Sequence, residues 1–310
     1  MKRLLYIAGG IGLLAFVMVL PMTQRAASAA PAAPAAPAAK NGPKAAKRMK
    51  PPKPPAPALP IPFVSVCTFS HRGPDDPIVK FNQPGASHSH DFFGNVTTAA
   101  NSTFDSLRAG GTTCSRAKDT AAYWVPTLMV DGQAVTPIGI NAYYRTGRHD
   151  PTSIQPFPSG LKIVAGNSKA TGPQSPQVVA FSCRGMDVPK QASPSVVPTC
   201  ATDAGHGLAM SIHFPDCWNG TDLDSADHQS HMAYSVRGVC PAGYPVPVPA
   251  LTVHVKYAIA GGAGVSLSSG PAYTAHADFF NAWDQAELTK LVQNCINAQV
   301  ECGARRSTGK

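Results

Sequence analysis

The chain has 310 residues, a formal net charge of +9 and 26 basic residues, nine of which lie in the first 53 positions without any acidic residue among them. Residues 54–310 carry 17 basic and 17 acidic side chains, so the positive charge belongs to the N-terminal segment alone. The rest of the chain has no electrostatic basis for binding nucleic acid.

Residues 1–29 have the three parts of a secretory signal peptide: basic residues, an apolar run and a small-residue site. The apolar run of 19 residues from Leu4 to Met22 is also long enough to span a bilayer. An uncleaved N-terminal membrane anchor is therefore the alternative to cleavage after Ala29. In both cases the remaining chain is extracellular, secreted or wall-associated.

Residues 30–60 form a low-complexity linker of Ala, Pro and Lys with ten prolines, which favour extended polyproline conformation. Its basic side chains give it a means of associating with anionic surfaces such as wall polymers or lipid head groups. Residues 61–302 are long enough for a single domain with a sizeable core. A short tail, residues 303–310, follows, and we expect a monomer.

Strand patterns dominate this domain. Apolar residues alternate strictly in segments 208–214 and 251–259, as they do in half-buried strands. Asp131-Gly132, between two short apolar runs, predicts a two-residue hairpin turn. One segment has helical periodicity, because Asp284 and Glu287 form a helix-start motif before apolar residues spaced three and four apart.

All eight cysteines lie in the domain, and an even number in an exported chain predicts four disulfides with 105 possible connectivities. Cys295 and Cys302 can pair only if the helix ends between them. The sequence thus predicts a mainly β, disulfide-braced sandwich or jelly-roll-like domain with one C-terminal helix.

Three segments concentrate histidine and aspartate. They contain His88, His90 and Asp91; Asp224, Asp227, His228 and His231; and His276 and Asp278. A packed core does not tolerate so many titratable groups without partners. We therefore expect the three clusters to converge on one site.

Two kinds of chemistry fit these clusters. Side chains two residues apart point to one side of an extended chain, so His88 and His90 can chelate one divalent ion, zinc or copper. His228, His231 or His276 would supply a third ligand. The metal-free alternative is glycoside hydrolysis by two carboxyl groups, with Asp91, Asp224, Asp227 and Asp278 as candidates and the histidines, including His231, tuning them.

Aromatic side chains near the clusters are candidates for stacking on sugar rings: Tyr144, Trp218 and Trp283. No G-x-G-x-x-G opens a helix after a strand, and neither a P-loop nor a G-x-S-x-G motif is present. The sequence therefore argues against a nucleotide cofactor and against a serine triad.

Several motifs occur in order along the chain: Ser87-His88-x-His90, Tyr123-Trp124-x-Pro126, Phe214-Pro215-x-Cys217-Trp218, Asp227-His228-x-Ser230-His231 and His276-x-Asp278-Phe279. Over residues 61–296 they resemble the secreted microbial domain-of-unknown-function family DUF1996. The resemblance implies a protein of unestablished activity, in a family where some members carry carbohydrate-binding modules on the same chain. Asn219 stands where the family usually has Asp, which argues against an obligatory carboxylate there.

These observations together predict a secreted hydrolase or lyase directed at a cell-wall polymer or another extracellular polysaccharide. Its site consists of His and Asp, and whether a metal assists is left open. The alternative is a non-catalytic extracellular module that binds glycan or has a structural role in the wall.

Overall fold

The computed structural model describes residues 63–184, 196–203 and 205–304. The predicted signal peptide (residues 1–29), the predicted linker (residues 30–60) and most of the predicted tail lie outside these residues. Among the described residues, no helix has the length and apolar character needed to cross a bilayer.

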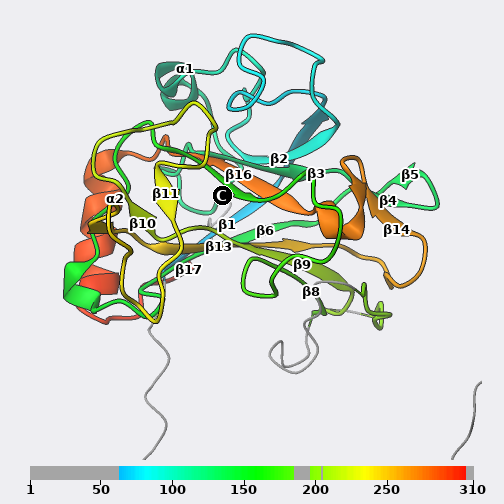
Figure 1. The fold of residues 1–310 in the computed structure, drawn as a ribbon. Coiled ribbons are helices and arrows are strands. Elements are labelled where there is room, and N and C mark those ends of the chain that lie inside the picture. Colours follow the sequence, from blue (N-terminus) through cyan, green and yellow to red (C-terminus); the bar gives the residue numbers. More distant parts are fainter. Residues whose placement is uncertain (1–62, 185–195, 204, 305–310) are drawn as a thin grey trace, which may run out of the picture. The chain divides into compact units, whose positions relative to one another are not determined.

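A ten-stranded sheet folds over into two layers and forms a nearly closed sandwich or barrel (Figure 1). The first layer contains β7 (Lys162–Gly166), β16 (His276–Phe280), β3 (Ala122–Pro126) and β2 (His90–Gly94). The second layer contains β6 (Gly139–Arg145), β13 (Ala250–Lys256), β9 (Leu208–His213) and β8 (Val179–Cys183). The predicted mainly β fold class is confirmed.

The long strand β1 (Phe63–Gly73) joins the two layers. Its first half pairs with β6 as far as Thr68, and its second half pairs with β2 from Phe69 onward. A register shift between Phe69 and His71 interrupts the second pairing, as expected where a strand bends. The short strand β17 (Gly303–Ala304) pairs with the start of β1, and its two residues directly follow the predicted end of the domain.

Two small sheets flank the layers. One contains β10 (Cys217–Trp218), β11 (Met232–Ala233) and β12 (Val246–Pro247); the other contains β4 (Leu128–Val130), β5 (Gln133–Ala134), β14 (Val265–Leu267) and β15 (Gly270–Pro271). Asp131 and Gly132 join β4 to β5 with φ values of 49° and 79°, the left-handed conformation that this hairpin turn requires. The predicted hairpin is confirmed.

The predicted C-terminal helix is also confirmed. Helix α2 (Gln285–Leu291) starts at Asp284, whose Oδ1 accepts a hydrogen bond from the Glu287 amide at 3.1 Å, and it continues as a π-helical turn, η4 (Val292–Asn297). The sequence did not predict the short helix α1 (Phe104–Ala109) or the 3-10 turns η1 (Pro151–Ser153) and η3 (Ala272–Thr274). At three to six residues they are too short for a periodic pattern.

All eight cysteines pair, as predicted. The four bonds are Cys67–Cys114, Cys183–Cys200, Cys217–Cys240 and Cys295–Cys302. The helical segment ends at Asn297, between the two cysteines of the last pair. The third pair joins residues 23 positions apart and closes a loop that contains the whole second His/Asp cluster.

Two apolar cores lie on the two sides of the first layer. The main core fills the space between the layers, and a smaller core contains Ile78, Phe92, Leu107, Trp124 and Phe280 on the outer face of the first layer. Segment 74–110, including α1, covers that outer face (Figure 1). Side chains on this face are therefore buried although they point away from the main core.

Candidate functional site

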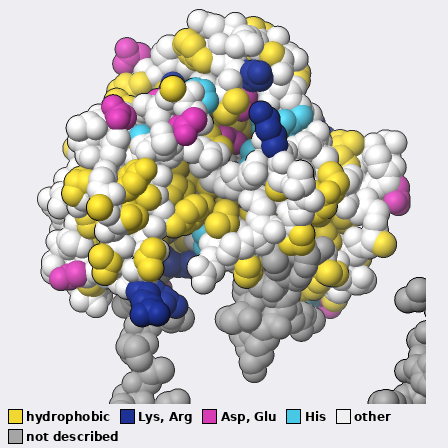
Figure 2. All heavy atoms as spheres, in the orientation of Figure 1, with side chains coloured by type: hydrophobic (Ala, Val, Ile, Leu, Met, Phe, Trp, Pro, Cys, Tyr) yellow, Lys and Arg dark blue, Asp and Glu magenta, His cyan; other side chains and the backbone are white. Residues whose placement is uncertain are grey.

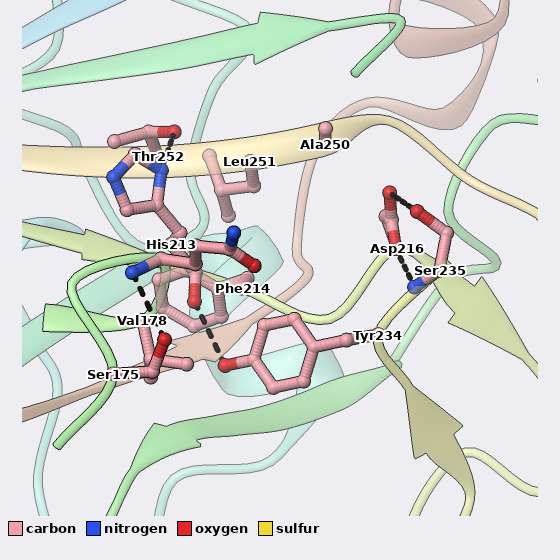
Figure 3. A pocket seen from close by; sticks show the side chains of 11 residues that line it. Ser175, Val178, His213, Phe214, Asp216, Tyr234, Ser235, Ala250, Leu251 and Thr252 are labelled. Atoms are coloured by element: carbon pink, nitrogen blue, oxygen red, sulfur yellow. Dashed lines mark hydrogen bonds between the residues drawn. The ribbon is translucent and has the colours of Figure 1, made fainter. Parts of the chain in front are cut away.

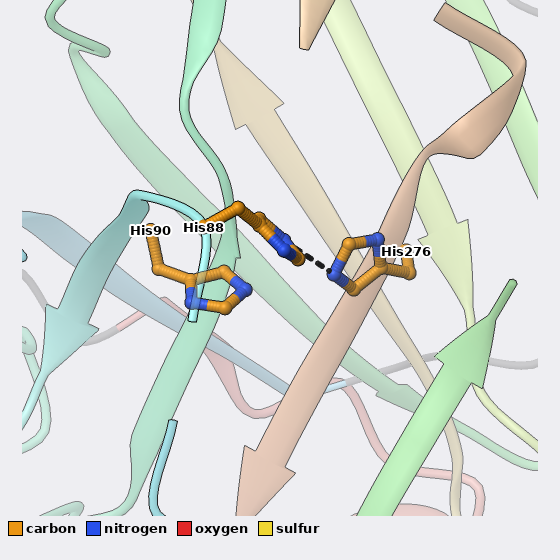
Figure 4. Close-up of side chains that lie close together, drawn as sticks. All are labelled: His88, His90 and His276. Atoms are coloured by element: carbon orange, nitrogen blue, oxygen red, sulfur yellow. Dashed lines mark hydrogen bonds between the residues drawn. The ribbon is translucent and has the colours of Figure 1, made fainter. Parts of the chain in front are cut away.

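Three histidines meet on the outer face of the first layer. His90 begins β2 and His276 begins β16, with β3 between the two strands, and His88 lies two residues before His90. One ring nitrogen from each lies within 4.8 Å of the others, and the Nε2 atoms of His88 and His276 are 3.2 Å apart (Figure 4). Two of the three predicted clusters therefore converge.

Backbone carbonyls fix the protonation of two of these rings. The Nδ1 atom of His90 lies 2.9 Å from the Asp75 carbonyl, and that of His276 lies 2.9 Å from the Thr274 carbonyl. A carbonyl only accepts, so Nδ1 carries the proton in both rings and the neutral ring presents a bare Nε2 lone pair. Nε2 of His90 is buried without a hydrogen-bond partner among the described residues.

The surroundings keep these imidazoles uncharged. Burial lowers the pKa of His88, lowers that of His90 well below its ordinary value, and lowers that of His276 to about 4. The neighbouring histidines lower the pKa of His90 and of His276 further. Neutral imidazoles with bare nitrogens are the form that binds a metal ion.

Asp278 lies beside the triad, two residues after His276 on the same face of β16. Its side chain is buried, and neither carboxyl oxygen has a hydrogen-bond partner among the described residues. Burial raises its pKa well above the ordinary value, and the nearby Asp76 carboxylate raises it further. Nε1 of Trp124, opposite Asp278 on β3, also lacks a partner in the described part of the chain.

The second His/Asp cluster contacts β7, the strand next to β16. Asp224 accepts a hydrogen bond from Nδ1 of His228 at 2.9 Å and pairs with Lys162 Nζ on β7 at 3.2 Å. Asp76, which the sequence did not single out, is buried, and burial raises its pKa, while hydrogen bonds from the amides of Val79 and Ile78 and the nearby His228 oppose that effect. Acidic, basic and histidine side chains gather around a hollow on this face in Figure 2.

Two other members of the second cluster stabilise its loop. The exposed Asp227 accepts hydrogen bonds from the amides of Gln229 and Ser230 and from the Ser225 hydroxyl, which hold its pKa low. His231 is buried and lies 2.7 Å from the Lys162 carbonyl, to which its Nε2 donates. These contacts attach the loop to β7, and neither residue joins the triad.

Asp91 lies on the opposite face of β2 from His90. Its buried carboxylate accepts hydrogen bonds from Arg72 Nε at 2.6 Å and from the Thr127 hydroxyl at 3.2 Å. Burial raises its pKa, and Arg72 opposes that effect. The prediction that Asp91 shares one site with His88 and His90 is therefore corrected, because adjacent strand residues point to opposite faces.

Two of the three aromatic predictions are corrected as well, and that for Trp218 stays a prediction. Tyr144 and Trp283 are fully buried in the main core, where Trp283 Nε1 donates to the Tyr144 hydroxyl at 2.9 Å, so neither ring can stack on a polymer. Trp218 is half-buried, and its Nε1 donates to the Asp222 carbonyl. Phe81, which the sequence analysis missed, is 42% exposed and lies beside Lys162.

One comparison with known proteins gives a match. A family model described as "Domain of unknown function (DUF1996)" matches residues 76–283. Neither the curated proteins nor the solved structures include a match to the chain. The matched range contains all three histidines of the triad and the loop closed by Cys217 and Cys240.

Proposed function

Since that model covers about two thirds of its length, the chain belongs to the DUF1996 family of unknown function, and we propose that it is a secreted, metal-dependent hydrolase or lyase acting on an extracellular polysaccharide. Its centre is the triad of His88, His90 and His276. The four disulfides fit a secreted protein.

The hydrogen bonding of the triad is the observation that carries the proposal. Metal-binding histidines normally donate their second ring N–H to a carbonyl or carboxylate, which is the arrangement of His90 and His276. Tetrahedral zinc with bonds of about 2.0–2.1 Å separates its nitrogen ligands by about 3.4 Å. The 3.2 Å between the Nε2 atoms of His88 and His276 is close to that value.

Three histidine ligands leave one position open for water or substrate. A divalent ion bound there would acidify a water molecule or polarise a carbonyl group. Asp278 provides a carboxyl group beside the triad, and burial, with the nearby Asp76, raises its pKa and so favours its protonated form. A protonated carboxyl group can donate a proton to a leaving-group oxygen, the second requirement of polysaccharide cleavage.

Elemental analysis of the tag-free protein tests the centre. We expect about one equivalent of zinc or copper per chain, falling to about one tenth or less in the double variant His88→Ala with His90→Ala. His254→Ala is the matched control, because this half-buried histidine lies on β13 in the second layer. Equal metal content in the double variant and the control would exclude the triad as the metal site.

Release of reducing ends from wall polysaccharides tests catalysis. We expect turnover that chelation abolishes and that the bound metal restores. A protein that holds the metal and binds glycan without releasing reducing ends would instead be a non-catalytic module. In that case the metal would have a structural role, attaching the loop before β2 to the start of β16.

A further inference from the structure

Two pockets lie next to each other, and one of them borders β7, the edge strand of the first layer. One, of about 260 Å³, is lined by Val164, Gly166 and Gln229 among others. The second, of about 330 Å³, is lined by residues of β9 and β13 and the loop after β11 (Figure 3). Both include Val178 and Tyr234, so the two pockets adjoin at these residues, and we refer to the pair as the groove.

The groove starts next to the triad. Gly166, which lines the first pocket, pairs with His276 in the ladder between β7 and β16, and Val164 pairs with Asp278. Partners in an antiparallel ladder have Cα atoms about 4.5–5.5 Å apart. Gly166 has a φ of +85°, and a Cβ atom there would lie 2.7 Å from the Ala275 carbonyl oxygen. Glycine therefore permits the close approach of β7 to the start of β16.

Tyr234 is a rigid and accessible ring. It is 40% exposed, and its hydroxyl donates to the His213 carbonyl at 2.9 Å, which fixes the ring orientation (Figure 3). The next residue, Ser235, donates both its amide and its hydroxyl to Asp216, at 2.7 and 2.9 Å. Asp216 also accepts a hydrogen bond from the buried His149. This network holds the tyrosine backbone in place before any ligand arrives.

We propose that the groove binds an extended, uncharged oligosaccharide, with one sugar ring stacked on Tyr234. The described lining offers hydroxyl, amide, imidazole and carboxylate groups and contains no Lys or Arg, which argues against an anionic polymer. Such groups pair with sugar hydroxyls, while an aromatic face packs against the apolar face of a sugar ring. The inference rests on the proposed function only for the cleavage reaction at the triad, next to which the groove starts.

Binding measurements by calorimetry test the groove independently of catalysis. The probes are β-1,3-glucose, β-1,4-glucose and β-1,4-N-acetylglucosamine oligomers of two and six units, with hexaglycine as a peptide probe. At least one hexamer should bind about tenfold or more tightly than its dimer, because only the hexamer spans both pockets. Tyr234→Ala should weaken hexamer binding about tenfold, as loss of an aromatic anchor does. Tyr234→Phe should retain most of the affinity.

Tyr143→Ala is the matched control, since this half-buried tyrosine lies on β6 in the second layer, outside both pockets. The double variant His88→Ala with His90→Ala should bind the hexamer as the unchanged protein does, so failure of the metal centre and failure of the groove give different results. Each of three results would overturn the proposal. No hexamer binds; Tyr234→Ala binds the hexamer as tightly as the unchanged protein does; or hexaglycine binds as tightly as the sugar hexamer.

Discussion

Replacing Asp119 with asparagine should remove a large part of the pH dependence of folding. Asp119 is fully buried, and burial raises its pKa to about 7 although the Tyr123 hydroxyl donates to both of its oxygens, at 3.2 and 3.0 Å. It ends a chain of hydrogen bonds that starts at Trp283 Nε1, a donor only, and passes through Tyr144 and Tyr123. This chain joins the two layers of the sheet.

The sign and size of the effect follow from linkage. Between its ordinary pKa of 3.8 and the folded value of about 7, Asp119 holds a proton in the folded protein and loses it on unfolding. The free energy of unfolding therefore falls as pH rises through this window. At 1.36 kcal/mol per pKa unit, the loss contributed by Asp119 is about 4 kcal/mol. That is a large fraction of the 5–15 kcal/mol by which domains are typically stable.

Urea denaturation at several values between pH 4 and pH 8 measures this contribution. Asparagine keeps an oxygen that can accept from Tyr123 but cannot ionise, so Asp119→Asn should gain stability relative to the unchanged protein as pH rises, and the gain should level off above pH 7. Asp105→Asn, at the exposed start of α1, is the control and should show no such gain. The reasoning would be refuted if the difference in the free energy of unfolding between Asp119→Asn and the unchanged protein stayed constant from pH 4 to pH 8 to within about 0.5 kcal/mol.

Three further predictions concern the other buried groups. Asp278→Asn should raise the free energy of unfolding of chelator-treated protein near pH 7, measured by urea denaturation, since burial opposes ionisation of the aspartate. His149 donates to both Asp216 and the Gly238 carbonyl, which raises its pKa, so its stabilisation is complete below pH 6.5 and lost as pH rises through the folded value. His149→Gln should cost about 3–5 kcal/mol at pH 5.5 in urea denaturation and abolish that pH dependence. Replacing Cys217 and Cys240 with serine should cost about 2–5 kcal/mol by the same assay and weaken hexamer binding, because this bond closes the loop that positions Tyr234.

Local sequence patterns were sufficient to predict much of the secondary structure. The alternation around Val253 and Met210, the Asp131-Gly132 turn and the capped helix after Asp284 each depend on neighbours within a few positions. The pairing of cysteines and the order of strands depend on contacts between residues far apart in sequence. No local pattern reports these contacts, so the sequence left the connectivity open.

At the candidate site, the burial of individual side chains was the property that the sequence predicted least well. Tyr144 and Trp283 are of residue types that often line sugar-binding surfaces, yet both lie in the main core. Tyr234 and Phe81, which are exposed, stand in loops without any periodic signal. Whether an aromatic residue in a β domain faces a core or a groove depends on which parts of the chain cover each face of the sheet. Here the second layer covers the inner face of the first layer and segment 74–110 covers its outer face. No local sequence pattern specifies this coverage.

The two similar segments His90-Asp91-Phe92-Phe93 and His276-Ala277-Asp278-Phe279-Phe280 show what one residue of spacing does. Both are strands of the same layer, and both place the first histidine on the outer face. Asp91 follows its histidine directly, so it points to the opposite face and pairs with Arg72. Asp278 follows one position later, so it returns to the face of the triad and remains without a partner in the described structure. Because side chains alternate along a strand, one residue of spacing thus decides whether the carboxylate pairs with Arg72 or faces the triad, and that spacing can be read from the sequence.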